Sequence, residues 1–387
     1  MKISDVVITT VKGLWGTDYS TPEDGIAVIK TNNMSYEGVI SYSDICYRNI
    51  ELEKAQKNFL KYGDILAEKS GGTKTHTVGY VSYFDGQSDK FVCNNFILVI
   101  RPNVQKIKSK FLFYQMRYMY ENGIFSDCYN RTTGIQNLQV NSYLGKDIKV
   151  FSEDKQEKIV SLLDSIISEI DNSKKRLAAL DELVKSRFIE MFGDIDLSPQ
   201  KSEWTKLSDL GTIYTGTTPS TGDETNWDGS ILWITPAEMN DESFFIDNTI
   251  RKITEKGMKS KSLSLMPVGT VLLSTRAPIG KVGIVAKPMT CNQGFKNFYC
   301  PNKLNSIFLY VVLKNNAQYL NAIGTGTTFK EISKTTCGNI RVPVPPIELQ
   351  NKFAEFVKLI DKSKFIVQQQ IKDLQELLDS KMDEYFR

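Results

Sequence analysis

Residues 159–184 read IVSLLDSIISEIDNSKKRLAALDELV, and residues 353–378 read FAEFVKLIDKSKFIVQQQIKDLQELL. In both stretches apolar residues return at alternating steps of four and three positions, and the register never slips. Such a series is the seam of a coiled coil, so each stretch predicts a long helix. The predicted seam residues are Ile159, Leu163, Ile166, Ile170, Leu177, Leu180 and Val184 in the first helix, and Phe353, Val357, Ile360, Val367, Ile371, Leu374 and Leu378 in the second.

Two positions of the series are polar, Ser173 in the first helix and Lys364 in the second. Polar residues at such positions usually specify a partner or a register at a cost in stability. The two seams can pair within the chain, which requires antiparallel helices, or each can pack on a partner protein. Both can hold at once, because a two-helix seam leaves a face free for further helices.

The repeat extends in front of the two helices. Its matches include Lys2–Val6 with Lys206–Leu210, Cys93-Asn94 with Cys291-Asn292, and Gln156 with Gln350. The offset drifts from one match to the next, which is typical of insertions in the loops between shared elements. A repeat of this length indicates a duplicated domain rather than a solenoid, whose units have roughly 20–50 residues.

The regions in front of the helices combine short β-type runs with turn residues. Ala27–Ile29 and Val282–Val285 have the composition of strands, and Lys110–Tyr120 that of a short helix with an aromatic core face. We therefore expect an α+β fold with two tandem, pseudo-repeated β-rich domains. Each domain is followed by a long helix, and the two long helices form an antiparallel coiled coil. The expected boundaries are 1–150, 151–193 (helix), 194–346 and 347–387 (helix).

Composition sets further bounds. The chain has 387 residues, of which 41% are hydrophobic and 24% charged, and its formal net charge is +3. These values are typical of a soluble globular protein, and nearly balanced charge neither requires nor excludes a nucleic-acid partner. Six scattered cysteines without a CxxC pair favour a reducing compartment. The sequence shows neither a signal peptide nor an apolar run of ~18 residues, so we expect a cytoplasmic protein without membrane contact.

The sequence lacks the usual catalytic motifs. Pro345-Pro346 lacks the flanking residues of a DNA methyltransferase loop, and Val282 follows Gly280-Lys281 where a phosphate-binding loop requires Ser or Thr. The single histidine, His76, cannot by itself build a metal site or a Ser-His-Asp system. We therefore expect no catalytic residue, metal or cofactor in this chain, which would position a substrate rather than transform it.

Polar loops in both domains suggest recognition chemistry instead. Glycine permits close backbone approach, hydroxyl groups donate to phosphate oxygens, and Arg, Asn and Gln contact base edges. Any one loop can equally be an ordinary surface turn, and Asn292-Gln293 can equally satisfy buried backbone groups. The candidate DNA contacts are Lys30, Asn32, Lys69, Ser70, Thr73, Lys74, Arg131, Thr132, Thr133 and Gln136 in the first domain, and Thr217, Thr218, Ser220, Thr235, Arg276, Thr327, Thr328 and Lys330 in the second.

Several short stretches follow one another in a fixed order around the two heptad helices. They are Arg187–Gly193 (RFIEMFG), Gly211–Ser220 (GTIYTGTTPS), Ile231–Pro236 (ILWITP), Asn292–Gly294 (NQG), Gly326–Thr328 before Ile332-Ser333, and Ile340–Pro346 (IRVPVPP) before Glu348 and Gln350. With these stretches the chain resembles, over nearly its whole length, the specificity subunit of type I restriction–modification systems. The first domain departs from the pattern, because it lacks the Thr-Gly-x-Thr-Pro stretch and has Asn94-Asn95 in place of Asn292-Gln293.

The resemblance implies two target-recognition domains, each reading one half of a bipartite sequence in double-stranded DNA. The long helices would act as a spacer and as docking sites for two modification subunits. Those subunits would carry S-adenosylmethionine and methylate adenine at N6, and a restriction subunit, if present, would use ATP and Mg. A helix of about 38 residues is ~57 Å long, so the half-sites should lie roughly one turn of B-DNA apart.

Two other functions remain open from the sequence. The chain can be the specificity subunit of a type II combined restriction–methylation enzyme, whose nuclease and methylase lie in another chain. It can also be a coiled-coil scaffold whose duplicated domains bind protein, in which case it has no affinity for nucleic acid.

Overall fold

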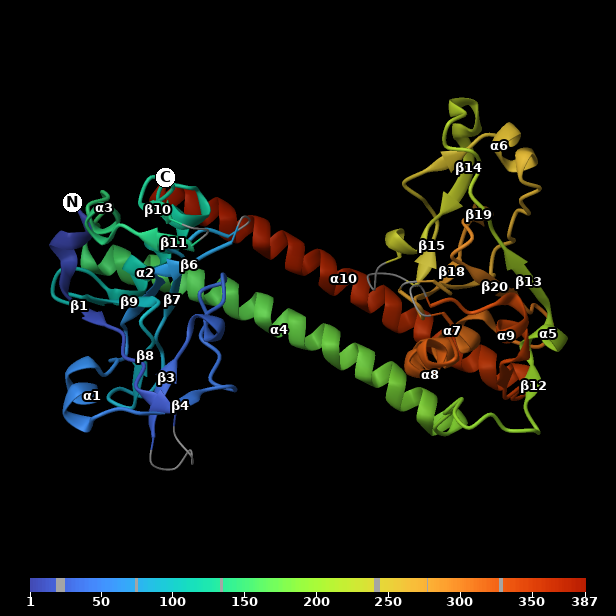
Figure 1. The fold of residues 1–387 in the computed structure, drawn as a ribbon, viewed down its shortest axis with the longest axis horizontal. Helices are drawn as coiled ribbons and strands as arrows, with labels where there is room; N and C mark the ends of the chain where they lie inside the picture. Colours follow the sequence, from blue (N-terminus) through green and yellow to red (C-terminus); the bar gives the residue numbers. More distant parts are fainter. Residues whose placement is uncertain (19–24, 74–75, 133–134, 240–243, 277, 327–329) are drawn as a thin grey trace. The chain divides into compact units, whose positions relative to one another are not determined.

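The computed structural model describes residues 1–18, 25–73, 76–132, 135–239, 244–276, 278–326 and 330–387 (Figure 1). The chain divides into two compact units, and each long helix contributes one segment to each unit. Unit 1 consists of Met1–Lys174 and Gln370–Arg387, and unit 2 of Lys175–Gln369. The long helices are α4 (Glu153–Phe192) and α10 (Ile347–Phe386), with 40 residues each.

The described residues of unit 1 form three small sheets. The first has the order β1 (Val7–Lys12), β9 (Ile97–Pro102), β5 (Ile65–Glu68), β7 (Val81–Tyr83). The second has the order β2 (Thr17–Asp18), β4 (Cys46–Asn49), β3 (Ile26–Ile29), β8 (Phe91–Cys93). The third has the order β10 (Tyr129–Thr132), β11 (Ile135–Leu138), β6 (Ser70–Gly71). The short helices are η1 (Ile3–Val6), η2 (Thr31–Asn33), α1 (Leu52–Asn58), α2 (Ser109–Glu121) and α3 (Val140–Leu144).

Unit 2 follows a related plan. Its largest sheet has the order β13 (Thr212–Thr215), β20 (Lys296–Tyr299), β17 (Val271–Leu273), β18 (Val282–Val285), β15 (Phe245–Ile246). The other sheets are β16 (Lys252–Ile253), β14 (Trp227–Ile234), β19 (Met289–Cys291), and the pair β12 (Thr205–Lys206), β21 (Arg341–Val342). The short helices are α5 (Leu207–Leu210), η3 (Glu224–Asn226), η4 (Pro236–Glu238), α6 (Glu255–Ser260), α7 (Ser306–Asn315), α8 (Ala317–Ala322) and α9 (Lys334–Asn339).

The duplicated Cys-Asn pair marks the same structural position in both units. Ile29 of β3 pairs in parallel with Cys93 of β8, and Ile234 of β14 pairs in parallel with Cys291 of β19. In each unit the asparagine that follows the cysteine donates its backbone N–H to that isoleucine's carbonyl oxygen. The backbone of a glycine that follows another strand, Gly13 in unit 1 and Gly216 in unit 2, passes close to each Cys-Asn pair. A Cβ on either glycine would lie 1.9 Å from a backbone carbonyl oxygen of the pair, so only glycine fits there.

The core of unit 1 joins a sheet, the aromatic helix α2 and segments of both long helices. Ile159, Leu163, Ile166 and Ile170 of α4 are at most 5% exposed and share this core with Leu378, Met382 and Phe386 of α10. The ring centroids of Phe111 in α2 and Phe386 lie 5.4 Å apart. The aromatic face expected for Lys110–Tyr120 is therefore a packing surface.

In unit 2 the end of α4 and the start of α10 enter the core, whereas in unit 1 the start of α4 and the end of α10 do so. Phe188, near the end of α4, shares a core with Phe353 and Val357, near the start of α10. The centroids of Phe308 in α7 and Phe192 lie 4.8 Å apart. In each unit the beginning of one long helix packs beside the end of the other, so the predicted antiparallel pairing and the α+β fold class are confirmed.

Most of the remaining seam positions are less enclosed than those within the two cores. Leu177, Leu180, Val184, Ile360, Ile371 and Leu374 are half-buried, and Val367 is buried. The polar position Lys364 is accommodated by an ion pair, with Lys364 Nζ 2.7 Å from Asp181 Oδ1 in unit 2. Among the described residues, no helix is both long and apolar enough to cross a membrane.

A buried glutamine anchors each short helix to its long helix. The Oε1 atom of Gln156 accepts a hydrogen bond from the Lys108 backbone N–H (2.8 Å), and that of Gln350 accepts one from the Asn305 N–H (2.8 Å). The Nε2 atoms donate to the carbonyl oxygens of Phe151 and Pro345, both at 2.8 Å. Gln156 is 3% exposed and Gln350 is fully buried. Each amide thus satisfies the start of α2 or α7, whose first N–H groups have no partner within the helix.

We predict that Gln350→Leu lowers the free energy of unfolding by about 2–3 kcal/mol, because it leaves a buried N–H and buried carbonyl groups without partners. Gln156→Leu should act on unit 1 in the same way. The measurement is urea-induced unfolding followed by tryptophan fluorescence and circular dichroism.

The matched control is Gln375→Leu, which removes an exposed amide from α10 that bonds to Asp379 in the same helix. Its effect should stay within about 0.5 kcal/mol. Equal losses in Gln350→Leu and Gln375→Leu would contradict the anchoring role.

Candidate nucleic-acid interface

Two tryptophan side chains hold the backbone of the loop Thr217–Ser220 of unit 2 by hydrogen bonds. Trp233 Nε1 donates to the Thr217 carbonyl oxygen at 3.2 Å, and Trp227 Nε1 donates to the Ser220 carbonyl oxygen at 3.1 Å. The two indole rings meet edge to face with centroids 5.1 Å apart. The Arg251 guanidinium lies 3.5 Å from the centroid of the Trp227 ring, a cation–π arrangement. The two packed indole rings therefore fix the position of the loop backbone.

A tight turn beside this loop exposes Gln293. Thr218 Oγ1 donates to Gln293 Oε1 at 2.7 Å. The neighbouring Asn292 accepts the Gly294 N–H on its Oδ1 atom at 2.9 Å, and Thr275 donates its N–H to the Gly294 carbonyl oxygen at 2.7 Å. Asn292 therefore satisfies the backbone of the turn, whereas Gln293 is exposed at its tip.

A charged cluster supports the same turn. Glu331 bonds to Arg276 Nη2 at 2.9 Å and to Lys296 Nζ at 3.3 Å. The side chain of Lys296 is only 9% exposed, and its Nζ also lies 3.5 Å from the Gln293 carbonyl oxygen. The bond from Arg276 lowers the pKa of Glu331, and Lys296 lowers it further. Arg276, predicted as a DNA contact, is thus already paired with a carboxylate.

In unit 1 the polar loop that follows β5 is held by Gln136. This side chain is 4% exposed, accepts the Val78 N–H on Oε1 at 3.2 Å, and donates from Nε2 to the Thr73 carbonyl oxygen at 2.9 Å. Ser70 Oγ donates to Asn137 Oδ1 at 2.6 Å, which ties β6 to β11. Gln136, predicted as a DNA contact, therefore has two hydrogen-bond partners within unit 1.

The predicted contact residues differ in accessibility. Those exposed are Asn32, Lys69, Thr73, Ser220, Arg276 and Lys330, and those half-buried are Lys30, Ser70, Thr217, Thr218 and Thr235. Lys74, Thr133, Thr327 and Thr328 lie outside the described residues, and Arg131 and Thr132 are described only as backbone of β10.

Thr235 is occupied within the protein. Its N–H and its hydroxyl group both donate to Glu238 Oε1, at 3.0 and 2.9 Å, and Glu238 Oε2 accepts the Ile250 N–H at 2.6 Å. These bonds fix η4 against the following segment. Like Gln136, Thr235 is a predicted DNA contact that also bonds to a residue of its own unit.

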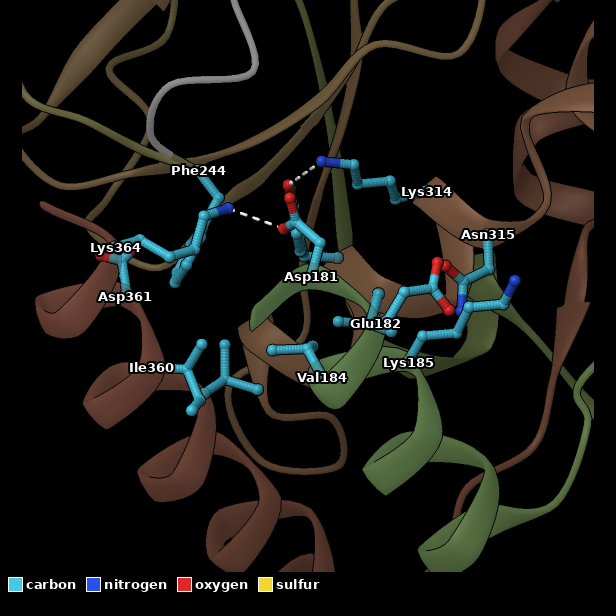
Figure 2. Close-up of a pocket in the computed structure, with 13 residues that line it drawn as sticks. Asp181, Glu182, Val184, Lys185, Phe244, Lys314, Asn315, Ile360, Asp361 and Lys364 are labelled. Carbon is cyan, nitrogen blue, oxygen red and sulfur yellow. Dashed lines mark hydrogen bonds and ion pairs between the residues drawn. The ribbon is translucent and has the colours of Figure 1, made fainter. Parts of the chain in front are cut away.

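Unit 2 also carries a groove on its long-helix segments. Figure 2 shows the groove, of about 460 Å³, with apolar Val184 and Ile360 beneath charged side chains. Lys364 reaches across to Asp181, and Lys314 Nζ lies 3.1 Å from the Tyr310 hydroxyl oxygen.

A second groove, lined by Leu180, Leu183, Ile366 and Val367 among others, lies on the same two helices. Leu183 is 47% exposed and Ile366 is 66% exposed. The paired helices therefore present apolar surface with a charged border.

Comparison with known proteins identifies the family. A family model for the type I restriction modification DNA specificity domain matches residues 20–182 and again residues 199–376. The chain belongs to this family. The chain is 38% identical over 184 residues to the type I restriction enzyme MjaIX specificity subunit of Methanocaldococcus jannaschii, covering 46% of this chain and 43% of the relative. It is 26% identical over 233 residues to the EcoR124I/EcoR124II specificity subunit of Escherichia coli, covering 57% of each.

The chain thus spans less than half of the first relative's length and little more than half of the second's. The S subunit of a type I restriction–modification system from M. genitalium superposes with a TM-score of 0.60 at 16% identity, covering 100% of this chain and 95% of that one. At this identity the likeness shows the fold, and the fold of the family is the one described above. Among the described residues, no group of three or more His, Cys, Asp or Glu side chains is placed to hold a metal ion.

Glu68, at the end of β5 next to the polar loop of unit 1, is an unusual carboxyl group. It is 8% exposed, and burial raises its pKa to about 7, although a backbone hydrogen bond from Gly72 opposes the shift. Tyr36 and Tyr80 face the same space, with ring centroids 4.5 Å apart, and the His76 ring stacks on Tyr36 at 4.1 Å.

We predict that the stability of unit 1 falls as the pH rises from about 4.5 to about 7. The folded state holds the Glu68 proton more tightly than the unfolded chain does, so stability is lost as that proton leaves. Glu68→Gln should reduce the change of the thermal unfolding midpoint with pH between pH 5 and pH 8. It should also stabilise the folded protein at pH 8 by up to about 3 kcal/mol.

The control is Glu355→Gln, which neutralises an exposed carboxylate on α10. It should leave the pH profile of the unaltered protein in place. A Glu68→Gln profile with the same slope as this control would refute the prediction.

Proposed function

We propose that the chain is the non-catalytic specificity subunit of a type I restriction–modification complex, reading a bipartite sequence in double-stranded DNA with one half-site per unit. The observation that carries this proposal is the duplication within a family of DNA specificity domains. Both units repeat the parallel strand pair, the Cys-Asn turn that follows it and the buried glutamine anchor. Two equivalent recognition domains on one chain suit a target with two parts.

The proposed partners are two methyltransferase subunits that carry S-adenosylmethionine, together with a restriction subunit that uses ATP and Mg where the system has one. The exposed apolar side chains of the long helices support docking of such partners, since Leu359, Phe365 and Ile366 are each more than 60% exposed. A pair of helices with an apolar outer face is suited to packing against further helices. In this proposal the chain supplies sequence recognition and assembly, and the partners supply the chemistry.

The first experiment is purification of the tagged chain from its host, followed by native mass spectrometry. The proposal expects two copies of an adenine methyltransferase per chain. A fused nuclease–methylase partner would instead indicate a type II combined enzyme. Recovery of the chain alone, with no affinity for duplex DNA, would support a protein-binding scaffold.

We predict that exchanging residues 1–150 for the equivalent domain of a relative with a different target changes one half of the methylated motif and leaves the other half intact. The reason is that each unit carries its own core and its own set of recognition loops. Single-molecule sequencing of host DNA reads both halves at once. A change in both halves would contradict independent reading, and the reciprocal exchange of 194–346 provides the control.

A further inference from the structure

We propose that Gln293 reads an adenine in the half-site recognised by unit 2, and that Thr218 is the positioning residue that orients its amide. This inference deepens the proposed function and rests on it. Gln293 was not among the contacts expected from the sequence. It is set apart by a side chain that is exposed while its surroundings are fixed by hydrogen bonds.

The backbone on both sides of Gln293 is immobilised. The carbonyl oxygen of Gly294 accepts from both the N–H and the hydroxyl group of Thr275, at 2.7 and 3.2 Å. A Cβ on Gly294 would lie 3.0 Å from Pro236 Cγ and 3.0 Å from Asn292 Oδ1, so the turn is closely enclosed. A readout residue needs this rigidity, because an amide must be placed within a fraction of an ångström to make paired hydrogen bonds.

Thr218 selects which edge of the amide faces outward. Its hydroxyl group donates to Gln293 Oε1 at 2.7 Å, and its loop is in turn held by Trp233 and Trp227. A carbonyl oxygen has two acceptor sites, so one acceptor site of Oε1 stays available beside the two N–H donors of Nε2. An amide that offers one acceptor and one donor side by side matches the N6 and N7 groups of adenine in the major groove.

The surroundings of Gln293 suit a DNA backbone as well. Lys330 is exposed and adjacent in sequence to Glu331 of the hydrogen-bonded cluster, and Arg276, although it is ion-paired with Glu331, keeps its side chain 46% exposed. Beneath them, Lys296 joins Glu331 to the carbonyl oxygen of Gln293. Cations of this kind contact phosphates and set the register in which a neighbouring side chain meets a base.

The internal repeat provides a second, independent observation. In unit 1 the turn after β8 has buried Asn94 followed by exposed Asn95, as unit 2 has Asn292 followed by exposed Gln293. Asn94 Oδ1 accepts the Phe96 N–H at 3.2 Å, in the same manner as Asn292 does for Gly294. The duplication has thus kept an exposed carboxamide at the tip of the same turn in both domains, and both Asn and Gln pair with adenine.

The test uses the full chain in its host, with the target motif read by single-molecule sequencing and the half-site of unit 2 assigned by domain exchange. Gln293→Ala should reduce discrimination about tenfold or more at one A·T position of that half-site. Thr218→Val should relax the same position, and Thr218→Ser, which keeps the hydroxyl group, should restore it. Gln318→Ala removes an exposed glutamine from α8 of the same unit and should leave the motif unchanged.

An unchanged motif in Gln293→Ala, or a change at a position that is not A·T, would overturn the inference. If methylation is lost altogether, the purified complex selects ligands from a library of degenerate duplexes, and the same single position should lose its preference. Selection of the original motif by that variant overturns the inference as well. Failure of the unaltered complex to bind DNA would instead remove the proposed function, so the two failures are distinguishable.

Discussion

The arrangement of each unit depends on one buried amide, that of Gln156 or Gln350. Each amide closes the exposed start of a short helix and at the same time bonds to the backbone at the start of a long helix. Because these groups are buried, any other orientation of the short helix would leave polar groups without partners. The short helix packs against the main sheet of its unit. The hydrogen bonds of the buried glutamine therefore also fix where the sheet and the loops at its edge lie relative to the long helix.

The long helices and the duplication could be predicted from the sequence, because both are visible as patterns of nearby residues. A heptad series can be recognised from neighbouring positions alone, and α4 and α10 begin and end within two residues of the expected helix boundaries. The match between Gln156 and Gln350 was also visible, but its meaning was not. Their partners Lys108 and Asn305 lie 48 and 45 positions away in the chain, and no local pattern connects them.

The candidate interface could be predicted less well, because residue type does not reveal which side chains are engaged within the protein. Gln136, Thr235 and Arg276 have the chemistry of DNA contacts, yet each is bonded to a residue of its own unit. Gln293 was not among the predicted contacts, because from the sequence Asn292-Gln293 could equally satisfy buried backbone groups. The repeat itself could have indicated Gln293, since both units have two adjacent amide side chains at the same turn. Among the described residues, only the first amide of each pair bonds to the backbone of the turn.

The sharing of the long helices has a consequence for the order in which the protein is made. The core of unit 1 is completed by Leu378, Met382 and Phe386, although its other buried residues belong to the first 174 positions. A ribosome synthesises those three side chains more than 200 positions after α2, with which they share the core. During that interval the apolar faces of α2 and α4 lack their final layer, so the amino-terminal recognition domain cannot reach its full stability before the carboxy-terminal one has been translated.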